Sequence, residues 1–240
     1  DKQLPSVDSG AVLREMLASG KVPTAVLTNV YRQANGSSIS HNASRINIGE
    51  PRMELDDTFE FHEATKSSEI LAITEDLYLE YISEYGLDNV CVLSPYKNKT
   101  ITGVNELNKK LQSLAFPDED PSENLFLVGD KVMYTKNDNG LTNGDIGRVL
   151  SCTKENGEAS VTIDFGDNRK ITLEDDAINS LQLAYSTTVH KSQGSEYKIV
   201  ILIVDPGHHI MLRRNLIYTA VTRAKQKLII VGDKASFAEG

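Results

Sequence analysis

The chain has 240 residues, of which 40% are hydrophobic and 25% are charged, as expected for a globular protein with a packed core. Its 25 Lys and Arg residues against 34 Asp and Glu residues give a formal charge of -9, which argues against binding duplex DNA or an anionic membrane through bulk positive charge. The longest apolar run, at 199–204, is too short to span a bilayer and no signal peptide is evident, so we expect a cytoplasmic protein without a membrane partner.

The first half of the chain alternates strand-like and helix-like patterns. A short strand is predicted at 24–28, and apolar residues at helical spacing predict helices at 39–46 and 70–85, each followed by a glycine. A continuous apolar run at 90–93 predicts a strand buried on both faces, and a further helix is predicted at 104–114. Alternation of this kind predicts a mainly parallel sheet covered by helices.

The pattern changes after an acidic, proline-containing linker at 117–124. Short strands separated by turn signals are then predicted, and their close spacing is typical of a small SH3-like β-barrel. They occupy 128–135, 146–152, 159–165 and 169–173. From 183 the α/β pattern returns, with buried strands at 199–204 and 228–231 around a helix at 212–224. The predicted fold class is therefore α/β, with a β-barrel inserted near the middle.

Several common sites are missing from the sequence. There is no Gly-x-x-x-x-Gly-Lys-Ser/Thr loop to hold nucleotide phosphates, and no apolar strand ends in an Asp-Glu pair suited to Mg²⁺. Neither Cys91 nor Cys152 belongs to a metal-ligand spacing. We therefore expect no metal site and no tightly bound nucleotide in this chain alone.

Polar clusters instead adjoin the buried strands. The densest runs from Ser186 to Glu196 and could present many hydrogen-bond donors to phosphate oxygens, although a capped surface loop fits it equally well. Arg223, at the end of a predicted helix, is either a charge that favours the helix dipole or an arginine finger. Arg32 is either a surface ion-pair partner or a second phosphate-binding arginine, and Tyr96 after the 90–93 strand could stack on a base.

Read in order, these clusters resemble the second half of a RecD/TraA-type superfamily 1 DNA helicase. The opening at 1–7 resembles motif III of that family, and Tyr31-Arg32-Gln33 resembles motif IV. Residues 188–196 resemble motif V almost position for position, and residues 215–225 resemble motif VI. Ser94-Pro95-Tyr96, with the helix after it, is similar to the Leu-Ser-Pro segment of these enzymes.

The resemblance implies two RecA-like domains that enclose ATP while single-stranded DNA crosses both. Residues 1–20 would be the tail of the first domain, 21–124 together with 183–240 the second domain, and 125–182 the inserted SH3-like barrel. The P-loop and the Mg²⁺ carboxylates belong to the first domain, so ATP and Mg²⁺ are cofactors of a longer parent. The partners implied are single-stranded DNA and the N-terminal RecA-like domain of that parent.

The resemblance also assigns residues on the nucleotide side. Gln3 would sense the γ-phosphate, and Arg32 and Arg223 would stabilise charge on the phosphoryl group in transfer. Gly194 and Glu196 would line the nucleotide side of the cleft.

A second set would contact DNA. Thr188 and His190 would face its backbone, Pro95 and Tyr96 would form part of its track, and Asn108 is a weaker candidate. Enzymes of this branch move 5′ to 3′, although these residues carry no polarity signal of their own.

Without a P-loop, the chain alone is expected neither to hydrolyse ATP nor to unwind DNA. Because it opens with Asp1, we expect it to be part of a longer helicase. Two other readings stay open at this stage. One is a stand-alone nucleic-acid-binding or regulatory module without ATPase activity, and the other is an unrelated hydrolase that uses His190 and Ser192.

Overall fold

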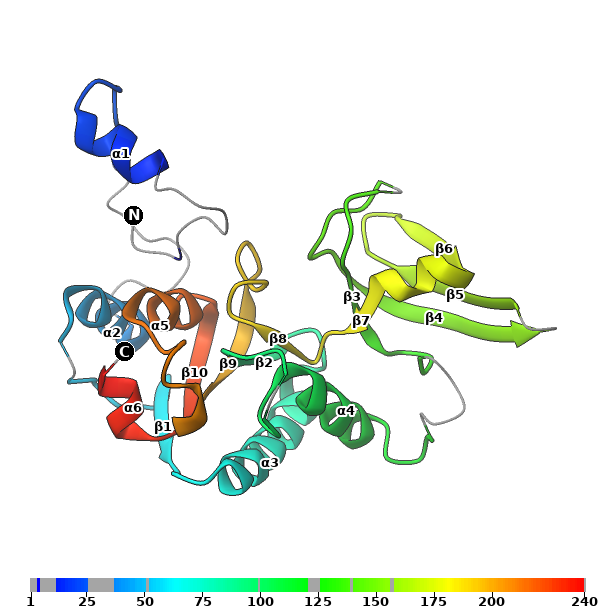
Figure 1. Ribbon diagram of the computed structural model, residues 1–240. Helices are drawn as coiled ribbons and strands as arrows, with labels where there is room; N and C mark the ends of the chain where they lie inside the picture. The colour runs from blue at the N-terminus through cyan, green and yellow to red at the C-terminus, as the bar shows by residue number, and fades with distance from the viewer. Residues whose placement is uncertain are drawn as a thin grey trace.

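The computed structural model describes residues 4, 12–25, 37–50, 52–98, 100–120, 126–138, 140–155 and 158–239. The strand predicted at 24–28 lies largely outside them, since only Thr24 and Ala25 are described and neither has regular structure. Helix α1 (Val12–Ser19) has no buried residue and lies apart from the other helices (Figure 1).

Five parallel strands form the central sheet, in the order β1-β10-β9-β2-β8 (Figure 1). The strands are β1 (Phe59–Glu63), β2 (Val90–Ser94), β8 (Ser186–Thr188), β9 (Tyr197–Val204) and β10 (Ala224–Gly232). Helices lie on both faces of this sheet. One face carries α2 (Ser38–Ile48), α5 (Arg214–Val221) and α6 (Lys234–Glu239), and the other carries α3 (Ser67–Tyr85) and α4 (Val104–Ala115). The predicted α/β fold with a mainly parallel sheet is therefore confirmed.

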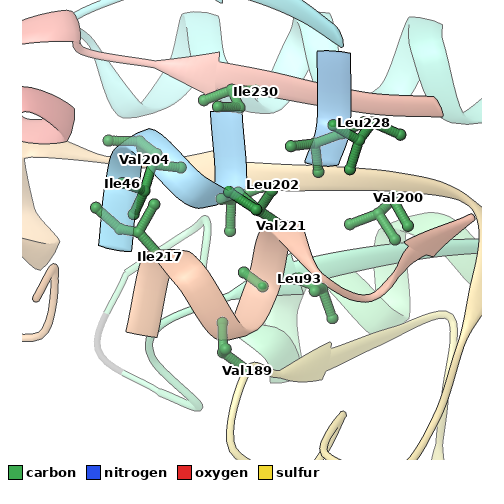
Figure 2. Close-up of a cluster of buried hydrophobic side chains, with 14 of the residues drawn as sticks. Ile46, Leu93, Val189, Val200, Leu202, Val204, Ile217, Val221, Leu228 and Ile230 are labelled. Carbon is green, nitrogen blue, oxygen red and sulfur yellow. The ribbon is translucent and has the colours of Figure 1, made fainter. Parts of the chain in front are cut away.

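Alternation along the central strands divides the interior into two cores. In β9, Val200, Leu202 and Val204 pack toward α2 and α5, as Figure 2 shows for the labelled residues. Ile199, Ile201 and Ile203 point the opposite way, toward α3 and α4. Because successive side chains of a strand point to opposite faces, a strand covered on both sides must be apolar throughout.

The helix predicted at 212–224 is shorter in the structure. Helix α5 ends at Val221, Thr222 caps it, and β10 already begins at Ala224. The early end has a physical cause, because the backbone carbonyl of Arg223 accepts a hydrogen bond from the Tyr197 N–H (3.1 Å) and so joins the start of β9.

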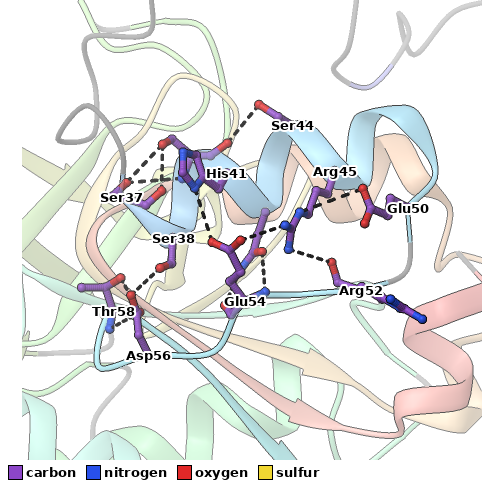
Figure 3. A network of polar contacts seen from close by, with 12 residues as sticks. Ser37, Ser38, His41, Ser44, Arg45, Glu50, Arg52, Glu54, Asp56 and Thr58 are labelled. Carbon is purple, nitrogen blue, oxygen red and sulfur yellow. Dashed lines mark hydrogen bonds and ion pairs between the residues drawn. The ribbon is translucent and has the colours of Figure 1, made fainter.

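Helix α2 is fixed at both ends and along its exposed side. The Ser37 side chain accepts a hydrogen bond from Ser40 N, and Gly49, with a φ of +77°, closes the helix in the left-handed region. The chain that follows runs back along the helix, where Arg45 Nη2 lies 2.8 Å from Glu54 Oε1 (Figure 3). These contacts set the path of the chain from α2 into β1.

A second, antiparallel sheet lies between α4 and β8 in the sequence, with the strand order β6-β5-β4-β3-β7. Its strands are β3 (Lys131–Tyr134), β4 (Ile146–Glu155), β5 (Glu158–Asp164), β6 (Lys170–Glu174) and β7 (Leu181–Leu183), and a 3₁₀ helix, η1 (Asp175–Ser180), precedes β7. This unit has its own core, in which Val132, Val149 and Ile163 are fully buried. Within the described part of the chain no pairing joins β6 to β7, so closure into a barrel stays a prediction.

Buried polar groups join the antiparallel sheet to the parallel one. The carboxylate of Asp130 accepts hydrogen bonds from the Tyr185 hydroxyl and from Gln112 Nε2, the latter at 2.7 Å. Lys131, only 1% exposed, donates from Nζ to the backbone carbonyls of Leu87 (3.1 Å) and Val90 (3.2 Å). Each buried charge thus has polar partners, as a charge removed from water requires.

Candidate nucleotide and DNA contact sites

The predicted site residues divide between two edges of the parallel sheet. Glu196 and Arg223 immediately precede β9 and β10, at the amino ends of these neighbouring strands. Pro95 follows β2, and Thr188 ends β8, where it pairs with the last residue of β2. Strand β9 has eight residues, so at about 3.3 Å each the two edges are roughly 25 Å apart. One domain therefore presents two separate polar surfaces.

Among the residues that the structure describes, Arg223 is the largest fully buried side chain, 1% exposed. Its guanidinium donates from Nε to Thr219 O (3.1 Å), from Nη1 to Ser195 O (3.3 Å) and from Nη2 to Thr222 Oγ1 (3.2 Å). It therefore binds a carbonyl near the end of α5, as a helix C-terminal cation does, and also ties α5 to the loop before β9. Both sequence interpretations of this arginine thus remain compatible with its position.

The segment at the start of the chain is represented by Leu4 alone. Its N–H donates to Thr219 Oγ1 at 3.2 Å, and its side chain packs against the core on the α2 and α5 face of the sheet. Thr219 therefore contacts Leu4 through its hydroxyl and Arg223 through its carbonyl. Gln3 and Arg32 lie outside the described residues, so their roles stay predictions.

Gly194 and Glu196 flank Ser195, whose carbonyl oxygen accepts a hydrogen bond from Arg223. Gly194 has a φ of +88°, in the left-handed region that L side chains rarely adopt, and no atom lies within 4 Å of where its Cβ would stand. Glu196 Oε2 lies 2.6 Å from Lys225 Nζ. Backbone freedom, rather than crowding, explains the glycine, and the space beside it leaves its backbone accessible to a ligand.

At the opposite edge, Tyr96 is held by its surroundings. Its ring meets that of His208 edge to face, with centroids 4.8 Å apart and planes at 70°. Its carbonyl accepts from Val104 N (3.0 Å) at the start of α4. Pro95 is buried, whereas Tyr96 is half-buried. The tyrosine thus combines a fixed ring with a partly exposed surface, which suits a stacking platform.

The turn after β8 brings Thr188 and His190 to this edge, both half-buried. Thr188 Oγ1 accepts from Lys191 N at 3.3 Å. Burial and the nearby Lys97 ammonium both lower the pKa of Lys191. The like charges of Lys97, which follows Tyr96 in the chain, and of Lys191, whose N–H is hydrogen-bonded to Thr188, thus act on each other at this edge, an arrangement that favours binding of an anion.

Asn108 and Ser192, both candidates from the sequence, form hydrogen bonds with backbone groups. Asn108 is 5% exposed, donates from Nδ2 to Leu183 O (2.9 Å) and accepts at Oδ1 from Ser186 N (2.7 Å). The structure thus gives Asn108 a structural role, holding α4 to the start of β8. Ser192 is buried and donates to Val189 O (2.7 Å), so the hydrolase reading loses its exposed nucleophile.

Asp205 and His208 form a buried polar cluster that was not predicted from the sequence. Both residues follow the apolar run at 199–204. Because binding sites in α/β sheets lie beyond the carboxyl ends of the strands, this position in the sequence could have identified them. Across the described ranges, no group of three or more His, Cys, Asp or Glu residues is placed to hold a metal ion. None of the helices described has the length and apolar character needed to cross a membrane.

Comparison with known proteins matches residues 183–231 to the UvrD-like helicase C-terminal domain family and residues 1–67 to an AAA domain family. The ATP-dependent RecD2 DNA helicase of Deinococcus radiodurans is 35% identical over 240 aligned positions, which cover 98% of this chain and 32% of that protein. RecBCD enzyme subunit RecD of Mycobacterium tuberculosis is 27% identical, covering 98% of this chain and 44% of that protein.

A solved structure described as showing DNA unwinding at forked double-stranded DNA by two coordinating Pif1 helicases has a TM-score of 0.55. It is 19% identical, and the match covers 98% of this chain and 60% of that one, which supports the fold alone. The chain spans about a third to less than a half of the curated relatives described above. Over almost its whole length, the chain therefore belongs to the RecD-type superfamily 1 helicase family, and it corresponds to a fragment of such a helicase.

Proposed function

We propose that this chain contributes the second motor domain of an ATP-dependent DNA helicase. Residues 21–124 and 183–240 would form that domain, 1–20 the tail of the first, and 125–182 an SH3-like insertion. The observation that carries the proposal is the position of Arg223, since its guanidinium joins the ends of the motif V and motif VI segments. An arginine held in this way is already oriented, as electrostatic stabilisation of a transition state requires.

In this proposal Arg223 and Arg32 act as arginine fingers toward ATP held by the first domain, where Mg²⁺ would also be bound. Arg223 would exchange one of its carbonyl partners for a phosphate oxygen when the two domains close. Gln3 would sense the γ-phosphate, and Leu4 supports this placement because its backbone touches Thr219. Gly194 would allow close backbone approach to the nucleotide, and Glu196 would line the same side.

Single-stranded DNA would cross the carboxyl edge of the sheet. Tyr96 would stack on a base beside Pro95, and Thr188 with His190 would contact the backbone. The neighbouring Lys97 and Lys191 support this placement, because phosphates would relieve their mutual repulsion. The polarity expected from the family is 5′ to 3′.

The rest of the parent's first domain would cover α1. Val12, Leu13, Met16 and Leu17 are all between 42% and 66% exposed, an unusual density of apolar side chains for one eight-residue helix facing water. A motor without its first domain has no phosphate cradle, so this chain alone would not turn over ATP. Unwinding of DNA is accordingly proposed for the longer parent and not for this chain alone.

The test compares this chain with a longer parent that carries the P-loop domain, measuring ATP hydrolysis with and without single-stranded DNA. We expect turnover in the parent only, stimulated by DNA. Arg223→Ala should lower it by about 10³-fold or more, whereas exposed Arg213→Ala, at the other end of α5, should leave it unchanged. ATP binding should survive both substitutions.

Three results would contradict the proposal. Hydrolysis by the fragment alone would reveal a nucleotide site elsewhere. Unchanged turnover in a folded Arg223→Ala parent would remove the finger assignment. An absence of ATPase in every form, with DNA binding retained, would favour a nucleic-acid-binding or regulatory module instead.

A further inference from the structure

A buried chain of polar side chains lies behind Tyr96, at the carboxyl ends of β2 and β9. Asp205 is 2% exposed, and Thr102 and His208 are fully buried. Thr102 Oγ1 donates to Asp205 Oδ2 at 2.7 Å, and Thr100 Oγ1 lies 3.1 Å from Thr102 Oγ1. His208 Nε2 is 2.9 Å from Thr100 Oγ1. The chain therefore connects the segment after β9 with the loop after β2, over a sequence separation of about a hundred residues.

The hydrogen-bond directions follow from what each group can donate. The Thr102 proton is used on Asp205, so its oxygen is left to accept from Thr100. The Thr100 proton is thereby used as well, so its oxygen must accept from His208 Nε2–H. Burial lowers the pKa of His208 and so favours the neutral ring, in which Nδ1 is then the unprotonated nitrogen; Nδ1 is buried without a partner among the described residues. A neutral imidazole with one defined tautomer results.

The rest of the cluster fixes Asp205. Burial by itself would raise the pKa of this carboxyl, but hydrogen bonds from Ser67, Thr102 and the Gly207 N–H hold it below the ordinary value. The anion therefore anchors the far end of the chain, while Ser94 Oγ donates to Thr102 O (2.7 Å) and ties the same loop to the end of β2. Every member of the chain except Nδ1 has a partner, which specifies one arrangement.

We infer that His208 is a positioning residue for Tyr96. The threonine–aspartate chain fixes the imidazole plane, and the imidazole in turn sets the tilt of the Tyr96 ring through their edge-to-face contact. Because the tyrosine is held from behind, its remaining exposed surface is presented in one orientation. This inference rests on the proposed function, in which Tyr96 stacks on a DNA base.

Preorganisation explains why so many buried polar groups are gathered here. A free tyrosine ring would lose rotamer freedom when a base stacks on it, and that loss would weaken binding. A ring already fixed by His208 avoids much of the loss. The prediction is a change in the affinity for single strands without a change in the number of phosphate contacts.

The test uses a matched pair at Thr100, whose hydroxyl is hydrogen-bonded to the His208 ring. Thr100→Val keeps the shape and removes the hydroxyl, whereas Thr100→Ser keeps the hydroxyl. Binding of the 240-residue chain to a fluorescent oligothymidylate is measured over a salt series. We expect Thr100→Val to weaken binding roughly 3- to 10-fold with the salt slope unchanged, and Thr100→Ser to retain wild-type affinity. His208→Ala should weaken binding at least as much, whereas exposed His209→Ala should not.

A spectroscopic readout separates the inference from the proposed function. In protein labelled with fluorotyrosine, the ¹⁹F signal of Tyr96, assigned with Tyr96→Phe, should shift or broaden in Thr100→Val without DNA. An unchanged signal in both Thr100→Val and His208→Ala would overturn the positioning role. If the signal changes but Tyr96→Ala leaves DNA affinity unaltered, positioning stands and the DNA contact proposed for Tyr96 is wrong.

A double-mutant cycle closes the test. In a Tyr96→Ala background, Thr100→Val should have no further effect on DNA affinity, because the ring it positions is gone. An equal loss in both backgrounds would show that Thr100 acts through general folding, and would refute the inference.

Discussion

Two fully buried tyrosines allow a controlled test of how polar groups stabilise this domain. Tyr185 and Tyr78 are each 0% exposed and belong to the same core, between the parallel sheet and helices α3 and α4. The Tyr185 hydroxyl donates to Asp130 and accepts from Lys131 N at 3.4 Å. The Tyr78 hydroxyl has no hydrogen-bond partner among the described residues. Replacing each by phenylalanine removes the same atom from two different electrostatic situations.

We expect Tyr185→Phe to destabilise the chain by about 2 kcal/mol, because a hydrogen bond to a buried charge is lost. Asp130 keeps its contacts with Gln112 and with the Leu127 N–H, which limits the loss. Tyr78→Phe should be neutral or stabilising by up to about 1 kcal/mol, since burial of an unpaired hydroxyl is itself unfavourable. The gap between the two variants is therefore about 2–3 kcal/mol.

Urea unfolding followed by circular dichroism measures both variants. A loss of about 2 kcal/mol moves the midpoint by roughly 0.7 M for a slope near 3 kcal/mol/M, and the slope itself should not change. Equal losses for Tyr185→Phe and Tyr78→Phe would refute the reasoning, because they would show that packing of the oxygen, and not its bonding, determines its contribution.

Further predictions concern backbone freedom and pH. Gly232→Ala should prevent folding, because its Cβ would stand 1.9 Å from Val204 O, whereas Gly194→Ala should cost only about 1 kcal/mol, for strain at a positive φ; soluble yield and urea midpoints measure both. Burial lowers the pKa of His208 below its ordinary 6.5, so the imidazole binds a proton more readily in the unfolded chain than in the folded one. The folded chain is therefore destabilised as the pH falls below about 6.5. The urea midpoint should therefore fall less steeply between pH 8 and pH 5 in His208→Phe than in wild type, and a parallel decline in both would contradict this.

The sequence by itself determined the elements whose patterns are strong. The all-apolar run at 199–204 predicted a strand covered on both faces, and Gly49 and Gly86 marked the ends of α2 and α3. These signals are local, because periodicity and capping are properties of neighbouring residues. The family followed from the motif V and VI segments, whose residue order is specific without reference to packing.

Other features depended on contacts between distant segments. Strand β1 was not predicted, since its partly exposed FEFHE sequence becomes an edge strand only by pairing with β10. The end of α5 was set by the pairing of Arg223 with Tyr197, which overrode a helical pattern.

The candidate site shows the same division. Sequence identified Tyr96 and Arg223 as residue types suited to stacking and to phosphate, but left each with a structural alternative. Only the tertiary structure placed Ser195 against Arg223 and His208 behind Tyr96. It also joined His208 to Thr100, which lies 108 residues earlier in the chain. Hydrogen bonds and ring contacts act over a few ångströms in space, so a sequence can supply the groups while the fold alone decides which of them meet.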